Sequence, residues 1–90
     1  MKRYLFVFSR HADRLFGKLQ KNVQSRILKK LAEIQKLQNP LLHAKKLEGM
    51  VGRYSFRIGD YRVIVTKKEN GQFLVLLILA VGHRKDVYEN

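Results

Sequence analysis

Two arginines five positions apart are the first side chains in this sequence whose type and spacing suggest chemistry. Arg57 and Arg62 flank the dipeptide Gly59-Asp60, which is typical of the two-residue turn of a tight β-hairpin. With that turn, Arg57 lies directly opposite Arg62, where like charges destabilise a sheet by about 0.2–1 kcal/mol. A phosphate between them would turn repulsion into attraction, because guanidinium groups bind phosphate bidentately. Two solvated arginines on an open sheet face are the alternative.

A charged tail after Gly82 contains three further groups that can act on a phosphodiester. They are His83, Arg84 and Tyr88. Histidine exchanges protons near neutral pH, arginine stabilises the charge of a phosphorane, and tyrosine stacks on a base or relays a proton. The tail is therefore a second candidate group, and a frayed basic terminus is the alternative interpretation.

The hairpin that positions the arginine pair has two chemically different faces. Side chains alternate along a strand, so each face is made of every second residue. One face is aromatic and aliphatic and comprises Tyr54, Phe56, Ile58, Tyr61, Val63 and Val65. The opposite face comprises Arg53, Ser55, Arg57, Arg62, Ile64 and Thr66. We therefore expect the first face to be packed and the arginine face to be open.

Periodicity predicts one strand and two helices before the hairpin. The apolar run Tyr4–Phe8 predicts a strand, with Ser9 as the N-cap of a helix over residues 11–21. Asn22 is a plausible cap for a second helix that ends near Gln38, because Pro40 excludes Asn39 from the helical region. The apolar stripe of this second helix is expected to be Val23, Ile27, Leu31, Ile34 and Leu37.

The remaining segments complete the predicted order of elements. Residues 41–52 are aperiodic and are predicted to form a loop with room for one helical turn. Residues 67–71 are predicted to be a turn because of Asn70-Gly71. The apolar run 73–81 then predicts a central strand, either buried on both faces or partly covered by a partner.

This order defines the fold class and domain organisation. Residues 1–90 form one α+β domain of order βααβββ, with a helical hairpin packed on one face of a small, mainly antiparallel sheet. Little chain is left to cover the other face, which also presents side chains of the apolar central strand. An exposed apolar patch rimmed by arginine is typical of a binding site.

Composition restricts the partners. The chain has 19 Lys and Arg against 7 Asp and Glu, a net charge of +12, which indicates a polyanionic partner such as nucleic acid or an acidic protein. The apolar runs are too short for a signal peptide or a membrane span, so we expect a cytoplasmic protein without a membrane partner. The absence of cysteine suits a reducing compartment. His11, His43 and His83 are scattered and the carboxylates do not cluster, so we expect neither a metal nor another cofactor.

Three motifs together carry a family resemblance. They are Lys46-Leu47-Glu48-Gly49, then Gly59-Asp60-Tyr61-Arg62-Val63-Ile64, then Gly82-His83-Arg84-Lys85-Asp86-Val87-Tyr88. With the order of elements, they resemble the RelE branch of the RelE/ParE toxin superfamily over essentially the whole chain. The resemblance implies a compact βααβββ domain related to small microbial ribonucleases. It also implies a type II toxin that cleaves mRNA in the ribosomal A site and is held inactive by a cognate antitoxin. That complex often represses its own operon, so operator DNA would be contacted only through the antitoxin.

The resemblance also assigns roles to individual residues. Arg62 corresponds to the arginine that stabilises the transition-state phosphate, and Arg84 to a second arginine linked to the leaving group. Tyr88 corresponds to the tyrosine that stacks on the substrate nucleotide. The implied reaction needs no metal: the 2′-hydroxyl attacks the adjacent phosphate and leaves a 2′,3′-cyclic phosphate and a 5′-hydroxyl.

Two positions depart from the family pattern. Arg57 and Ser55 stand where well-studied members have lysines, and arginine stays protonated, so it cannot be a base at neutral pH. We therefore hypothesise that His83 accepts the 2′-hydroxyl proton, alone or with Tyr88. The catalytic set is thus Arg57, Arg62, His83, Arg84 and Tyr88. The predicted RNA-binding set is Arg53, Ser55, Lys45, Lys46, Lys29, Lys30 and Lys85, although Lys29 and Lys30 also suit a solvated helix face.

Two other functions remain open at this point. A ParE-like toxin of the same fold would inhibit DNA gyrase as a protein ligand, and a non-catalytic basic module would only bind RNA. In each toxin case an antitoxin with an acidic, amphipathic segment suits the basic charge and the uncovered apolar strand.

Overall fold

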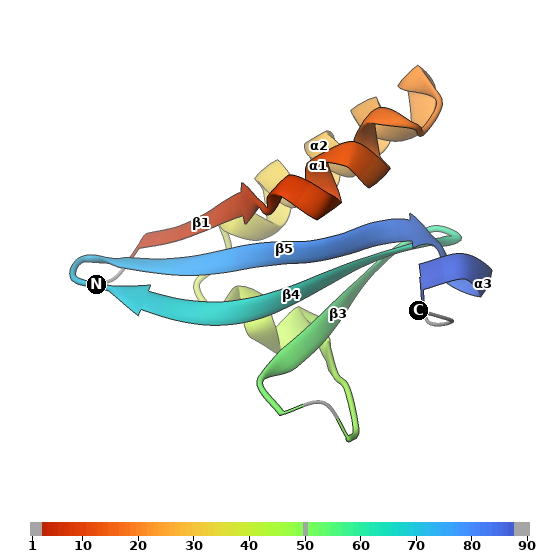
Figure 1. The fold of residues 1–90 in the computed structure, drawn as a ribbon. Helices are drawn as coiled ribbons and strands as arrows, with labels where there is room; N and C mark the ends of the chain where they lie inside the picture. Colours follow the sequence, from red (N-terminus) through yellow and green to blue (C-terminus); the bar gives the residue numbers. More distant parts are fainter. Residues whose placement is uncertain (1–2, 50, 88–90) are drawn as a thin grey trace.

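A five-stranded mixed sheet carries two helices on one face (Figure 1). The structure is a computed structural model that describes residues 3–49 and 51–87. The strands are β1 (Arg3–Phe8), β2 (Lys45–Lys46), β3 (Arg53–Ile58), β4 (Tyr61–Asn70) and β5 (Phe73–His83), in the spatial order β1-β5-β4-β3-β2. β1 is parallel to β5 and the other neighbours are antiparallel. The predicted α+β class and mainly antiparallel sheet are confirmed, and β2 is a strand where a loop was predicted.

The first helix, α1 (Arg10–Gly17), begins as its sequence predicts and ends earlier. Ser9 is its N-cap, and the Ser9 Oγ accepts the Ala12 N–H at 3.1 Å. The prediction that the helix continues to residue 21 is wrong. Glycine is a poor helix former, and the last turn is closed by Lys18 N–H bonding the carbonyl of Leu15.

The second helix, α2 (Lys21–Gln35), also differs at both ends from its prediction. Its N-cap is Gln20, so the prediction of Asn22 as the cap is wrong. It ends at Gln35, three residues before Gln38, and Leu37, which was expected in the buried stripe, lies beyond the helix and is 40% exposed. A 3₁₀ turn, η1 (Pro40–His43), follows. It corresponds to the single helical turn that the prediction allowed in the loop over residues 41–52.

The core lies between the helices and one face of the sheet. α2 contributes Val23, Ile27, Leu31 and Ile34, and the sheet contributes Phe56, Ile58, Val63, Val65, Leu74, Leu76, Ile78 and Val81. Tyr54 and Tyr61 pack against this cluster. The aromatic and aliphatic face predicted for the hairpin is therefore confirmed as the packed face.

The hairpin register is also confirmed. Arg57 pairs with Arg62 and Ile58 with Tyr61, around the Gly59-Asp60 turn. Gly59 has a φ of 61°, which glycine adopts without the steric cost of a Cβ. A turn does join β4 and β5, as Asn70-Gly71 predicts, but its predicted bounds of residues 67–71 are wrong, because β4 continues to Asn70 and the turn is Gly71-Gln72. Lys67–Glu69 are exposed residues of β4, and their consecutive charged side chains are more typical of a loop than of a strand.

A bulge in β5 sets which of its side chains enter the core. The ladder passes from Ile64 opposite Ala80 to Val65 opposite Ile78, so Leu79 is an extra residue. This shift lets Ile78 and Val81 both face the core. The prediction of a strand buried on both faces is wrong, because the alternate side chains of β5 are half-buried.

The described part of the charged tail, residues 83–87, is ordered into the end of β5 and a short helix. β5 reaches His83, and the short helix α3 (Arg84–Val87) follows at the end of the sheet near the Gly59-Asp60 turn (Figure 1). Tyr88 lies outside the described residues. Within the described ranges, no helix is both long and apolar enough to cross a membrane.

Candidate functional site

The arginine pair occupies the face of the sheet opposite the helices. Arg57 on β3 and Arg62 on β4 are direct cross-strand partners, and Gly82 on β5 is the next neighbour of Arg62. Alternation from the buried Phe56 and Val63 places both arginines on the open face. The two guanidinium groups therefore share a surface that the helices do not cover.

Both side chains of the pair bend toward the hairpin turn. The Arg57 Nε donates to the Gly59 carbonyl at 3.4 Å, and the Arg62 Nη1 donates to the Tyr61 carbonyl at 3.3 Å. These distances are at the weak end of the hydrogen-bond range. A charged oxygen of a phosphate is a stronger acceptor, so either guanidinium can exchange its backbone contact for a ligand.

The tail meets the same turn. The Arg84 N–H donates to the Asp60 carbonyl at 2.8 Å, a short bond that fixes the start of α3 against the hairpin. Because Arg62 also neighbours Gly82, three arginines from β3, β4 and α3 have their backbones at one end of the sheet. The structure thus places the backbones of Arg57, Arg62 and Arg84 at one end of the sheet.

The His83 side chain lies on the other side of the sheet from Arg57 and Arg62. It pairs with Tyr61, and alternation from Val81 directs both rings toward the helix side of the sheet. The two rings meet edge-on, with centroids 5.7 Å apart. The His83 Nδ1 accepts the Lys85 N–H at 3.3 Å, and this bond favours the neutral tautomer that carries its proton on Nε2. The structure does not place His83 on the face that carries the arginine pair.

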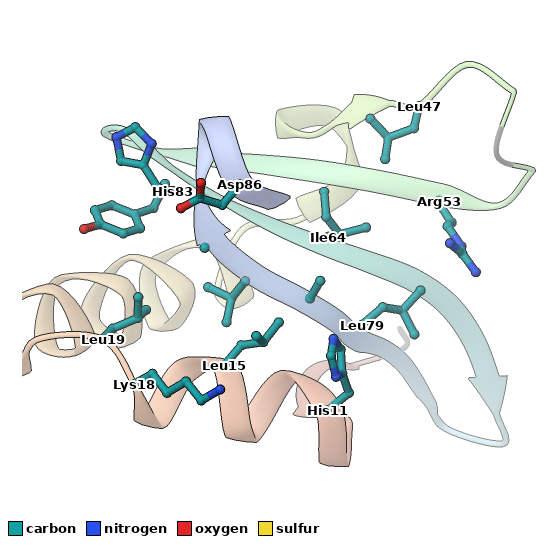
Figure 2. Close-up of a pocket in the computed structure, with 14 residues that line it drawn as sticks. His11, Leu15, Lys18, Leu19, Leu47, Arg53, Ile64, Leu79, His83 and Asp86 are labelled. Carbon is teal, nitrogen blue, oxygen red and sulfur yellow. The ribbon is translucent and has the colours of Figure 1, made fainter. Parts of the chain in front are cut away.

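A groove of about 560 Å³ lies between α1, the strands β4 and β5, and the segment that contains Leu47 and Arg53 (Figure 2). Its floor is formed by β4 and β5, including Ile64 and Leu79. α1 forms one wall, and Leu47 and Arg53 form the other. His83 and Asp86 lie at the end nearest α3. The groove is apolar, as predicted for the uncovered surface, but Arg53 is the arginine that lines it, and Arg57 and Arg62 do not.

Strand lengths explain why the groove lies there. β1 ends at Phe8, opposite Ile78, while β5 continues to His83. Beyond that point α1 replaces β1 beside β5, and its side chains form the wall. His11, Leu15 and Lys18 share one helical face at i, i+4 and i+7. The sequence pattern does not identify His11 and Lys18 as site residues, because the helical period shows that they share a face but not that this face borders β5.

The other predicted binding residues are scattered. Lys45 and Lys46 are exposed on the edge strand β2, and Lys85 is exposed on α3. Lys29 and Lys30 are exposed on α2, which covers the opposite face of the sheet, so they are separated from the groove. Ser55 is only 3% exposed, although it lies on the arginine face.

The segment after β2 explains part of this burial. Leu47 lines the groove together with Ile64, and the Gly52 carbonyl accepts the Thr66 hydroxyl at 3.0 Å. The segment therefore returns over part of the open face. Among the residues that the structure describes, no three His, Asp or Glu side chains are close enough to hold a metal ion.

Comparison with known proteins identifies the class. The sequence profile of the family described as the ParE toxin of the type II toxin–antitoxin system parDE matches residues 6–88. The chain therefore belongs to this toxin family, within the RelE/ParE superfamily. No curated protein matched the chain significantly.

Solved structures of RelE toxins share the fold. The RelBE2 toxin–antitoxin complex of Mycobacterium tuberculosis contains a chain that is 26% identical, with a TM-score of 0.74 over 91% of this chain and 99% of that one. A double arginine-to-alanine variant of the E. coli toxin RelE is 26% identical, with a TM-score of 0.72 over 97% and 92% of the two chains. A chain of the RelB–RelE complex of Methanococcus jannaschii is 24% identical, with a TM-score of 0.65 over 92% and 95%.

Proposed function

We propose that this toxin is a ribosome-dependent endoribonuclease that cleaves mRNA in the ribosomal A site. The observation that carries the proposal is the cross-strand pair of Arg57 and Arg62 on the open face, with the backbone of Arg84 fixed to the same turn. A sheet gains nothing from two like charges directly opposite each other. A phosphodiester between them gains two bidentate partners.

The proposed chemistry is a transesterification within the RNA. The 2′-oxygen forms a bond to the adjacent phosphorus, and the bond from phosphorus to the 5′-oxygen breaks, which yields a 2′,3′-cyclic phosphate and a 5′-hydroxyl. Arg62 and Arg57 would stabilise the negative charge that develops on the phosphorane oxygens. Arg84 would stabilise the negative charge on the leaving 5′-oxygen, which takes a proton from water to become the 5′-hydroxyl. No metal takes part in this scheme.

The proposed base in this scheme is His83, alone or with Tyr88. Because the His83 ring lies on the helix side of the sheet, the substrate must bend around the end of the sheet for its 2′-hydroxyl to reach this ring. In the tautomer that the Lys85 bond favours, the Nδ1 lone pair is the one that can accept a proton. Proton transfer to His83 therefore requires this 3.3 Å bond to open. We expect His83→Gln to slow cleavage by at least about 100-fold, the usual contribution of a general base. Full activity of His83→Gln in a ribosome assay would reject the assignment.

The decisive test uses the purified chain with ribosomes programmed by a defined mRNA. We expect breaks within the A-site codon whose upstream fragment ends in a cyclic phosphate. Arg62→Ala should reduce the rate by about 100-fold or more, the usual cost of removing a transition-state donor. Lys36→Ala is the matched control, because Lys36 is an exposed cation at the C-terminal end of α2. Intact mRNA with the wild-type chain would refute the proposal.

A cognate antitoxin is the proposed protein partner. Structural relatives in the RelBE complexes are seen with one, and a domain of net charge +12 with an apolar groove suits an acidic, amphipathic segment. Operator DNA would be contacted only through that antitoxin. We place the protein in the cytoplasm, where ribosomes and mRNA are found.

Inhibition of DNA gyrase is the second candidate function. It is favoured by the description of the matching family, which names the parDE system. A gyrase inhibitor would induce an SOS response and leave mRNA intact, whereas the proposed nuclease would break translated transcripts. The absence of both effects would indicate a module that only binds RNA. The serine at position 55 is the feature that supports this alternative.

A further inference from the structure

A fourth arginine reaches the hairpin turn from the other layer of the molecule. The Arg26 Nη1 lies 3.6 Å from the position that a Cβ on Gly59 would occupy. Arg26 belongs to α2, between Val23 and Ile27, and both of these are buried in the core. The backbone that carries Arg26 is therefore fixed, while its side chain is exposed beside the turn.

The turn is a point where arginines from four elements meet. Three successive carbonyl groups of the turn accept hydrogen bonds from arginines. The Gly59 carbonyl accepts from the Arg57 Nε, the Asp60 carbonyl from the Arg84 backbone N–H, and the Tyr61 carbonyl from the Arg62 Nη1. These arginines belong to β3, α3 and β4, and Arg26 adds α2. Asp60 is the only carboxylate within the turn itself.

Such a gathering of cations is unfavourable without an anion. The guanidinium groups of Arg26, Arg57 and Arg62 against the Asp60 carboxylate leave a local excess of positive charge, and mutual repulsion raises the free energy of the unliganded state. The core does not require a cation at position 26, because the apolar stripe of α2 is complete without it. A polyanion that passes the turn would interact with the side chains of Arg26, Arg57 and Arg62.

We propose that Arg26 binds the RNA phosphate next to the one held by Arg57 and Arg62. This inference rests on the proposed nuclease function. The substrate strand then leaves the arginine pair over the tip of the hairpin and continues toward the first turns of α2. Arg26 is in this scheme a substrate-positioning residue, because it touches a phosphate that does not react.

The test measures binding of a single-stranded oligoribonucleotide that carries 2′-O-methyl groups and therefore cannot be cleaved. Dissociation constants of the purified chain are measured at several salt concentrations from low salt upward. We expect Arg26→Gln to weaken binding about tenfold, as for one lost charge-assisted contact. The slope of log affinity against log salt should fall by about 0.7 for one lost phosphate contact to a single strand.

Lys36→Gln removes the same charge from the far end of α2, ten residues or about 15 Å along the helix. We expect it to change affinity less than twofold and to leave the salt slope unchanged. Equal effects of Arg26→Gln and Lys36→Gln would overturn the inference, and so would a wild-type chain that does not bind the oligonucleotide at low salt. Both positions are exposed, and thermal melts check that both variants fold.

The ribosomal cleavage assay separates this inference from the proposed function. A wild-type chain that cleaves mRNA, together with equal binding by the two variants, would keep the nuclease and remove the role of Arg26. A wild-type chain that cleaves nothing, while Arg26→Gln loses RNA affinity and salt slope, would keep the binding site and remove the nuclease.

Discussion

Replacing Arg57 by glutamine should make the empty protein more stable and its response to phosphate weaker. Arg57 faces Arg62 directly across β3 and β4, and it is exposed. Removal of one charge relieves a repulsion of about 0.2–1 kcal/mol at low salt. The Arg57 Nε bond to the Gly59 carbonyl is also lost, but at 3.4 Å and in solvent it offsets only part of this gain.

Phosphate should reverse this order of stability. A ligand that binds only the folded state stabilises it by RT ln(1 + [L]/Kd), which is about 1.4 kcal/mol at ten times Kd. For a domain of this size, that free energy raises the Tm by about 6–11 °C. The wild-type chain holds phosphate between two guanidinium groups, whereas Arg57→Gln retains only Arg62. Wild type should therefore overtake the variant as phosphate replaces chloride.

The assay is urea and thermal unfolding at neutral pH in sodium chloride and in sodium phosphate of equal ionic strength. Equal ionic strength matters because screening alone reduces the repulsion between exposed charges. Lys36→Gln is the control, with the same charge change far from the turn. An equal phosphate response of wild type, Arg57→Gln and Lys36→Gln would refute the idea that the arginine pair is an anion site.

Three further predictions concern the elements that position the site. Ser9→Ala should lower the free energy of unfolding by about 1 kcal/mol, because the Ser9 Oγ caps α1, and urea melts measure this loss. Gln35→Ala should speed hydrogen exchange of the Phe6 amide, whose N–H donates to the Gln35 Oε1 at 3.3 Å, and unchanged exchange would contradict that contact. Gly59→Ala should cost about 1–2 kcal/mol because the φ of Gly59 is 61°, whereas Gly17→Ala in α1 should stabilise by about 0.5–1 kcal/mol, since nothing lies within 4 Å of its added Cβ.

Local patterns in the sequence predict much of this fold. Alternation and the Gly59-Asp60 turn fix the hairpin register, so the opposition of Arg57 and Arg62 follows from the sequence alone. The apolar stripe from Val23 to Ile34 likewise identifies the buried face of α2. Both depend on neighbours within a few residues, where the side-chain period of a strand or helix decides the outcome.

Features that depend on distant contacts are not predicted. The charged residues Lys67–Glu69 look like a loop, and only pairing with the apolar β5 makes them a strand. The two-residue strand β2 is defined by its pairing with Ser55 and Tyr54, which no periodicity shows.

The same division between local and distant contacts holds for the candidate site. The residues of the arginine pair and the tail come from local motifs, and the structure places their backbones at one end of the sheet, while their roles stay a prediction. The groove wall was missed because it requires β1 to end at Phe8 while β5 continues beside α1. Arg26 cannot be predicted because its proximity to Gly59 depends on how α2 packs against the sheet, and these two elements are far apart in the sequence.

Mapping of transcript ends in cells after induction tests the central claim most directly. We predict new 5′-hydroxyl ends within the codons of translated transcripts for the wild-type chain and for Lys36→Ala, and none above background for Arg62→Ala. Intact transcripts accompanied by an SOS response, or an Arg62→Ala variant that breaks mRNA as fast as wild type, would contradict the account.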